Sequence, residues 1–422
     1  MLTTIYYNSL EQRYQNRMHR FWAELQDKER GGYYGEVDSD FNVHTDAVKG
    51  CILNSRILWF FSHADDFDDR QHLEHAKQAF DFLVNAFYDR EYGGVYWSVT
   101  ADGKPSDEMK HTYNIAFAIY ALAAYYEASQ EPEALSLARQ LMQVIEEKCR
   151  DEAGYLEAFT RDFGPHSNEH LSENGVMATR TMNTLLHVME AYTELHRVAP
   201  SDATRDRLRE ILLIFRDKIY NPELHRLEVF FDKDYNSLID LHSYGHDIEA
   251  SWLIDRAVEV LQAEGTEYDL SEITEVLRRK IYEVAFDGHS LPAECCKGEV
   301  LETRVWWVQC EAVVGFFRGY LKTGNKDYAN AAAKIYWYAY HTMISVHPHF
   351  GWYPEILPGG VPDMAKNIAD AWTCPYHSGR MYYELFAMEK DGSRVVDDFF
   401  SNPSNCKEPD PSYLYTNIDK WK

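Results

Sequence analysis

The chain of 422 residues lacks several features that mark secreted, membrane-spanning and zinc-binding proteins. Its seven cysteines are scattered and form no CxxC pair, which argues against both a disulfide framework and a zinc site. No apolar run approaches the roughly 20 residues of a membrane span, and the first residues, MLTTIYYNSLEQRYQNR, hold no apolar stretch behind a basic end. We therefore expect a cytoplasmic protein without a bound metal.

The chain is also poor in positive charge, with 42 lysines and arginines against 68 aspartates and glutamates. Its formal net charge of -26 would repel nucleic acid and anionic membrane surfaces, so neither is expected as a partner. The GxSxG, GxGxxG and GxxxxGK(S/T) motifs are missing, which leaves serine-hydrolase, dinucleotide and P-loop functions without support. We expect a monomer that acts on a small neutral ligand and needs no cofactor.

Six blocks of polar and aromatic residues open apolar helical stretches at intervals of roughly 60–75 residues, a spacing that indicates an internal repeat. The blocks are Lys49 to Arg56, Lys110 to Phe117, Thr181 to Val188, Ser243 to Ser251, Arg304 to Glu311 and Trp372 to Arg380. If six helices begin at one central place, the three histidines, the arginine and the aromatic residues of these blocks meet there. Such a mixture favours sugar chemistry.

Amphipathic segments such as Glu133 to Glu147 and Asp202 to Lys218 lie between the blocks and bring the predicted number of helices to about twelve. The segments that follow the blocks, such as Asn114 to Tyr126, are apolar nearly all round, as expected of helices with neighbours on every side. Inner and outer helices in alternation predict an all-α fold, an (α/α)6 barrel.

Turn-rich segments with alternating residues, such as Gly31 to Val37 and Tyr92 to Ser98, join the predicted outer helices to the next inner ones. They predict short β-hairpins on the face where the inner helices begin. We expect one catalytic domain over residues 1–390, followed by a C-terminal tail over 391–422 that is rich in Asp, Pro, Ser and Asn.

Two of the three histidines have a polar partner one helical turn away. His246 and Glu249 are separated by three positions, so on a helix the carboxylate can hold the tautomer of the imidazole and prepare a general base. A metal half-site and a hydrogen-bonded core histidine are the alternatives. His187 follows Asn183 by four positions, again on one face, and a lone core histidine is the alternative reading there.

His377 follows Pro375, which fits the first turn of a helix and places the histidine at the positive helix end, where a neutral imidazole is favoured. Arg56 interrupts an apolar run, and burying a guanidinium there is costly unless it meets an anion or many acceptors. Trp306 and Trp307 are adjacent, so we expect one to face the site and the other to pack.

Without a cofactor, neutral histidines and an arginine suit proton abstraction next to a carbonyl, which on a sugar means epimerisation or isomerisation. An (α/α)6 glycoside hydrolase is an alternative and would need paired carboxylates. Candidates for such a pair are Glu36, Asp38, Glu173 and Glu311. A non-catalytic sugar-binding protein is a further alternative, although it would not need three histidines at helix starts.

The motifs KHTYNIAFAIYAL, TMNTLLHV, SYGHDIEASWL, RVWWVQCEAVVGF and CPYHSGRM resemble those of the N-acylglucosamine 2-epimerase family. The resemblance runs from Phe21 to roughly Met388 and is strongest to the members that act on cellobiose. It implies an (α/α)6 barrel that needs no metal. It also implies reversible conversion of the reducing-end glucose of a β-1,4-linked disaccharide, such as cellobiose or lactose, to mannose. A mannose or N-acylglucosamine 2-epimerase is the alternative within the family.

By the same resemblance, His246 and His377 are similar to an acid/base pair that works on opposite faces of C2 in the ring-opened sugar. His187 is similar to the histidine that assists ring opening, Arg56 to the arginine that stabilises the cis-enediolate, and Glu249 to the carboxylate that tunes His246. The positions similar to substrate contacts are Tyr113, Asn183, Trp306, Trp307 and Trp372.

Overall fold

The structure is a computed structural model that describes residues 17–64, 71–345, 347 and 351–390. The predicted tail over 391–422 lies outside the described residues.

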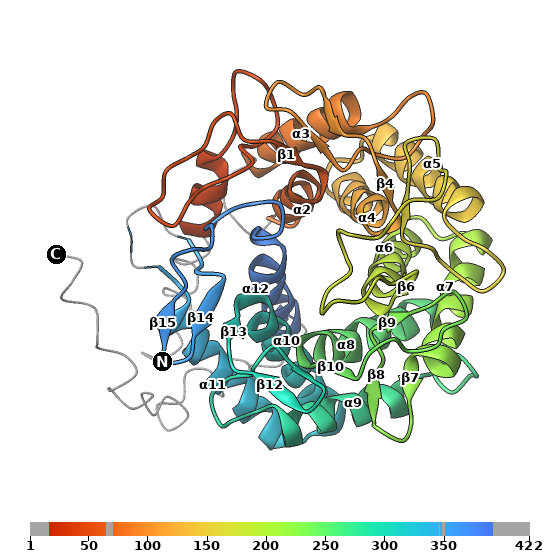
Figure 1. Ribbon diagram of the computed structural model, residues 1–422, viewed down its shortest axis with the longest axis vertical. Coiled ribbons are helices and arrows are strands. Elements are labelled where there is room, and N and C mark those ends of the chain that lie inside the picture. Colours follow the sequence, from red (N-terminus) through yellow and green to blue (C-terminus); the bar gives the residue numbers. More distant parts are fainter. Residues whose placement is uncertain (1–16, 65–70, 346, 348–350, 391–422) are drawn as a thin grey trace.

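Six inner helices form a closed ring around a common axis (Figure 1). They are α2 (Cys51–Ser62), α4 (Thr112–Ser129), α6 (Met182–Val198), α8 (Tyr244–Leu261), α10 (Trp306–Thr323) and α12 (Pro375–Lys390). Each packs against the next, and α12 packs back against α2. Every one of them begins within or directly after one of the six sequence blocks, because the apolar stretch behind each block can be buried on all sides. Residues 113–125 of α4, for example, are all buried.

The outer helices alternate with the inner ones along the chain and cover them from outside (Figure 1). They are α3 (Gln71–Phe82), α5 (Pro132–Lys148), α7 (Asp202–Ile214), α9 (Ser271–Val284) and α11 (Lys326–Thr342), with a further helical segment over 17–24. Two of them continue into π-helical turns, η1 (Leu83–Phe87) after α3 and η2 (Phe215–Ile219) after α7. The predicted (α/α)6 barrel is confirmed.

Short antiparallel strands lie where the inner helices begin, as predicted. Those directly before an inner helix are β1 (Lys49–Gly50), β4 (Lys110–His111), β6 (Arg180–Thr181), β10 (Leu241–Ser243) and β13 (Arg304–Val305). Their partners in the following repeat are β2 (Ser98–Val99), β5 (Ala158–Phe159), β9 (Phe230–Phe231), β11 (Glu294–Cys296) and β14 (Glu355–Leu357). Further pairings add β3 (Pro105–Asp107), β12 (Glu299–Leu301) and β15 (Val361–Pro362), and join β7 (Tyr220–Asn221) to β8 (Arg226–Leu227). An isolated bridge between Val37 and Ala369 connects the first repeat to the last.

An acidic residue in the turn after an outer helix is paired with the basic residue that precedes the next inner helix. Asp89 accepts backbone hydrogen bonds from Glu91 and Tyr92 through one oxygen, while its other oxygen lies 2.9 Å from Nζ of Lys110. The same arrangement recurs in the pairs Asp27–Lys49, Asp151–Arg180 and Asp287–Arg304. These pairs attach each hairpin to the start of an inner helix and so help to fix the helix ends that carry the site.

The Asp89–Lys110 pair provides a test of this attachment. Asp89→Asn keeps the shape of the turn, because asparagine has nearly the same shape as aspartate. It leaves the Lys110 ammonium without a full counter-charge, and this matters because both side chains are buried. We expect the free energy of unfolding in urea to fall by roughly 3 kcal/mol. Asp102→Asn, which affects an exposed pair with Lys104, is the matched control and should leave the transition unchanged. Equal midpoints for the two variants would contradict a structural role for Asp89.

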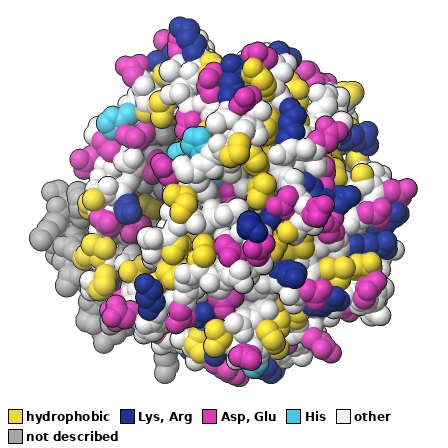
Figure 2. All heavy atoms as spheres, turned by 45° about the vertical axis from the view of Figure 1, so that its right-hand side comes forward, with side chains coloured by type: hydrophobic (Ala, Val, Ile, Leu, Met, Phe, Trp, Pro, Cys, Tyr) yellow, Lys and Arg dark blue, Asp and Glu magenta, His cyan; other side chains and the backbone are white. Residues whose placement is uncertain are grey.

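None of the described helices combines the length and apolar character that a membrane span requires. On the face shown in Figure 2, acidic and basic side chains are interspersed and no single-sign patch dominates.

Candidate active site

The first two turns of the inner helices bring Arg56 of α2, Tyr113 of α4 and His187 of α6 together. One guanidinium nitrogen of Arg56 donates to the Tyr113 hydroxyl at 2.9 Å, and the Tyr113 and His187 rings lie edge to face at 5.1 Å. The predicted site residues of these three repeats therefore converge, although successive members are separated by 57 and 74 positions in the sequence.

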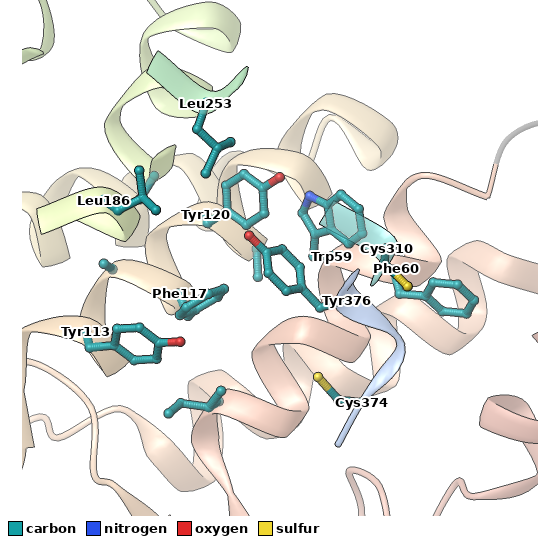
Figure 3. Close-up of a cluster of buried hydrophobic side chains, with 14 of the residues drawn as sticks. Trp59, Phe60, Tyr113, Phe117, Tyr120, Leu186, Leu253, Cys310, Cys374 and Tyr376 are labelled. Carbon is teal, nitrogen blue, oxygen red and sulfur yellow. The ribbon is translucent and has the colours of Figure 1, made fainter. Parts of the chain in front are cut away.

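Arg56 is held between two aromatic rings. Its guanidinium carbon lies 4.2 Å from the ring centre of Phe117 and 4.7 Å from that of Tyr376. Figure 3 shows this aromatic region, where Phe117 from α4, Tyr376 from α12 and Trp59 from α2 lie together. Because no carboxylate pairs with Arg56 among the described residues and its Nε has no hydrogen-bond partner there, its charge is available to an anionic ligand group.

Two of the three histidines use a glutamate to fix one ring nitrogen. Nδ1 of His187 lies 2.8 Å from Glu190, and Nδ1 of His377 lies 2.7 Å from Glu311. Since a carboxylate only accepts hydrogen bonds, both Nδ1 atoms carry the proton, and Nε2 is the nitrogen left for proton exchange.

His246 has a different partner from the one predicted. Its Nδ1 lies 2.7 Å from the hydroxyl of Ser243, and the hydrogen bond of Glu249 goes to Arg380 instead. The expected contact between His246 and Glu249 is therefore a wrong prediction. The reason is local: His246 is in the first turn of α8, so its ring turns back toward the residue that precedes the helix.

Arg380 links three buried carboxylates, two of which bind site histidines. It donates to Glu190 and to Glu249, and its Nη2 lies 2.6 Å from Glu311. Glu311 also accepts a hydrogen bond from Trp252 Nε1 at 3.0 Å. Through Glu190 and Glu311, this one arginine supports the partners of both His187 and His377.

Burial sets the protonation of the cluster. Burial lowers the pKa of His187. It also lowers the pKa of His377, to which the charges of Arg56 and Arg380 contribute. The pKa of His246 is lowered to about 3 by burial and, to a smaller extent, by His187. Neutral imidazoles are therefore available near pH 7. The low pKa of His377 agrees with the prediction, but burial rather than the helix end is its main cause.

The pKa values of two carboxylates around Arg380, Glu190 and Glu249, shift in opposite directions. Burial acts to raise the pKa of Glu190, yet Arg380 and His187 bring it down to about 2. Burial and the nearby charge of Glu311 raise the pKa of Glu249 to about 8. Three carboxylates around one arginine are thus accommodated by keeping a proton on Glu249 at neutral pH.

Trp307 lies between the two histidines of the predicted pair. Its ring centre is 4.9 Å from that of His246 and 5.5 Å from that of His377. Gly245 permits this position, because a Cβ there would lie 2.5 Å from the Trp307 ring. Trp306 is buried with its ring edge-on to His377 at 6.3 Å, so both tryptophans reach the site.

Trp372 and Asn183 lie at the edge of this region. Trp372 is 36% exposed, and its ring centre is 6.0 Å from both Tyr113 and Trp97. Asn183, on α6, has a buried Oδ1 without a hydrogen-bond partner in the described part of the chain. Trp372 thus lies beside Tyr113, and the Oδ1 of Asn183 is left free to accept a hydrogen bond.

Glu249, Glu311 and His377 bring potential metal-ligating atoms within 4.8 Å of one another. Arg380 already binds both carboxylates, so its guanidinium supplies the positive charge that a metal ion would bring. A second group, His63, Glu127 and Glu194, holds Arg197 between its carboxylates in the same way.

The family model described as N-acylglucosamine 2-epimerase (GlcNAc 2-epimerase) matches residues 32–378. The chain belongs to this family. The resemblance predicted from the histidine motifs is therefore confirmed over most of the chain.

Among curated relatives, the chain is 46% identical to the cellobiose 2-epimerase of Eubacterium cellulosolvens over 382 residues, which cover 86% of this chain and 94% of the relative. It is 44% identical to the cellobiose 2-epimerase of Ruminococcus albus over 372 residues, covering 88% and 96%. Among solved structures, the cellobiose 2-epimerase of Bacillus thermoamylovorans superposes with a TM-score of 0.86 at 40% identity, over 90% of this chain and all of that one.

Sequence reasoning missed Glu190, Tyr376, Arg380 and Ser243 as parts of the site. Glu190 follows His187 by three positions, the same spacing as Glu249 after His246, and Arg380 follows His377 by three. The spacing that was used for one histidine thus pointed to the partner of His187, and it pointed to Arg380, which binds the Glu311 partner of His377.

Proposed function

We propose that the protein is a cellobiose 2-epimerase that interconverts the reducing-end glucose and mannose of β-1,4-linked disaccharides, converting lactose to epilactose by the same step. The observation that carries the proposal is that His246 and His377 both lie against the ring of Trp307, with the charge of Arg56 close to His377, in a chain whose curated relatives are cellobiose 2-epimerases. The proposal includes a monomer in the cytoplasm that uses neither metal nor organic cofactor.

His246 and His377 are proposed to exchange the proton at C2. Because Nδ1 of each ring is bound to the protein, proton exchange falls to Nε2. The histidine that is neutral takes the proton from C2 of the ring-opened sugar and becomes an imidazolium, and the other, which has to carry a proton on Nε2 at the start of the step, gives that proton to the opposite face and becomes neutral. The configuration at C2 is thereby inverted. Proton exchange with solvent then restores both rings. Microscopic reversibility exchanges the two roles when mannose is the starting epimer.

Arg56 and His187 are proposed to act on the sugar oxygens. The guanidinium of Arg56, which no carboxylate of the described residues neutralises, stabilises the negative charge of the cis-enediolate. His187, 5.1 Å from Tyr113 and fixed by Glu190, assists ring opening by moving the proton between the ring oxygen and O1. Glu249 supports the site through Arg380 rather than by direct contact with His246.

The substrate is proposed to contact Tyr113, Asn183, Trp306, Trp307 and Trp372. The flat rings of Trp307 and Trp372 suit the apolar faces of two sugar units, and the free Oδ1 of Asn183 suits a sugar hydroxyl. The exposed Trp372 lies outermost among them and is proposed to contact the non-reducing sugar.

Two of the four candidate carboxylates, Glu311 and Asp38, do not favour a glycoside hydrolase. Glu311 is committed to His377, Trp252 and Arg380, and Asp38 lies in an exposed turn where it binds Asn42. A hydrolase needs an acid and a base aligned across the bond that is cleaved.

Incubation of the chelator-treated protein with cellobiose in deuterated water tests the proposal. We expect NMR to show glucosyl-mannose that carries deuterium at C2, and the rate to be unaffected by the chelator. Release of glucose would indicate hydrolysis, and binding without conversion would indicate a sugar-binding protein. Conversion of free mannose or N-acetylglucosamine, but not of cellobiose, would assign the chain to another branch of the family.

A further inference from the structure

The three histidines of the site differ in what holds Nδ1. His187 and His377 each face a glutamate, whereas His246 faces the uncharged hydroxyl of Ser243 at 2.7 Å. Glu249 lies one turn beyond His246 on the same helix, and its hydrogen bond goes to Arg380.

Ser243 occupies the N-cap position of α8, where a serine hydroxyl ordinarily accepts a backbone hydrogen bond from the first turn. The equivalent residues Thr181 on α6 and Ser201 on α7 do so, with Thr184 and Thr204 as donors of the backbone N–H. The Ser243 side chain makes no such cap, and its hydroxyl is directed to His246 instead. A group that normally stabilises the helix is here committed to a site residue.

The backbone of Ser243 is well placed to fix the ring. Ser243 is the last residue of β10 and pairs with Glu294 of β11, and the next backbone N–H, of Tyr244, donates to Ala293. Ser243 is buried and paired in the strand, so its hydroxyl approaches His246 from a rigid strand end rather than from a loose loop.

The hydroxyl also adds no charge next to the ring. The titratable groups that act on His246 from neighbouring helices are His187 on α6, which lowers its pKa, and Glu311 on α10, which raises it. On the paired strand, Glu294 is hydrogen bonded to Asn174. A carboxylate at position 243 would be a much closer anion and would favour the imidazolium form.

We propose that Ser243 is a positioning residue for the epimerisation: its hydroxyl fixes the orientation of the His246 ring without a charge and so keeps this histidine a neutral base. This inference rests on the proposed function. It explains why the N-cap hydroxyl is withdrawn from the helix and why the nearby Glu249 is bound to Arg380.

Two substitutions separate orientation from charge. Ser243→Ala removes only the ring contact, because no cap is lost, and should lower kcat for cellobiose about ten-fold with KM and the pH profile unchanged. Ser243→Asp is compatible with an N-cap and should fold, but it should raise the acidic limb of the pH profile of kcat/KM by roughly 1–3 units. The sign follows because a closer anion raises the pKa of His246, and the protonated ring is not a base.

Ser201→Ala, at the N-cap of the outer helix α7, is the matched control and should lower Tm while leaving kcat unchanged. The ring nitrogens of His246 give a readout that needs no turnover. Their ¹⁵N NMR signals, assigned by their loss in His246→Asn, should shift in Ser243→Ala but not in Ser201→Ala.

The inference would be overturned if kcat and the ¹⁵N chemical shifts of the His246 ring in Ser243→Ala were within error of the parent. It would also be overturned if the acidic limb of the pH profile of kcat/KM did not move in Ser243→Asp. Failure of the proposed function is distinguishable from this. In that case the parent protein does not epimerise cellobiose, and the NMR comparison still decides whether Ser243 holds His246.

Discussion

His377→Asn is expected to abolish epimerisation of cellobiose, with kcat reduced by roughly 10²–10⁴-fold. The asparagine amide can still donate to Glu311, so the buried carboxylate keeps a partner, but the group that exchanges a proton at C2 is lost. His246→Asn should have an effect of the same size, because the enediolate must be deprotonated on one face and protonated on the other. Sugar binding should persist in both variants, as titration calorimetry with a reduced disaccharide can show.

The two variants should differ in the exchange reaction that they retain. In deuterated water each remaining histidine can still remove and return the C2 proton of one epimer, so one variant should exchange only the glucose form and the other only the mannose form. His225→Asn is the matched control, since His225 is exposed in a left-handed turn conformation that asparagine also adopts, and it should behave as the parent. Full activity in either site variant, or exchange of the same epimer by both, would refute a pair acting on opposite faces.

The barrel could be predicted because its signal is repeated six times. Each inner helix is apolar nearly all round and is opened by polar residues, as in α4 behind Lys110 and His111. The bounds agree closely where the amphipathic pattern is strong: the predicted segment Glu133 to Glu147 is α5, Pro132–Lys148. The π-helical end of the segment Asp202 to Lys218 could not be predicted, because the hydrophobic pattern there does not distinguish it from an α-helix.

The pairing of the histidines was harder to predict, because one spacing has two outcomes. His187 and Glu190 are three residues apart and form a hydrogen bond at 2.8 Å, whereas His246 and Glu249 have the same spacing and do not use it. His187 lies in the second turn of α6, with helix on both sides, while His246 lies in the first turn of α8 next to a strand end. The choice depends on the residue before the helix and on the tertiary partner Arg380, neither of which the spacing contains.

Replacing Arg380 is expected to lower the stability of the fold strongly. Arg380→Met should lower the free energy of unfolding by about 3–5 kcal/mol, because it leaves Glu190, Glu249 and Glu311 buried without their shared cation. Lys77→Met, which affects an exposed pair with Asp81 on α3, is the control and should cost less than about 0.5 kcal/mol. Urea denaturation followed by circular dichroism measures both.

The destabilisation of Arg380→Met should depend on pH in a defined direction. With the arginine present, the pKa of Glu249 is already raised from 4.5 to about 8, so the folded protein holds a proton that the unfolded chain releases above pH 4.5. Such a group stabilises the fold at low pH and loses that contribution as the pH rises toward 8. Removing the cation raises the pKa of the neighbouring carboxylates further, so the variant should be closest to the parent near pH 5 and furthest from it near pH 8. A deficit that is constant across this range would mean that Arg380 acts through packing against Trp252 and Tyr376 rather than through its charge.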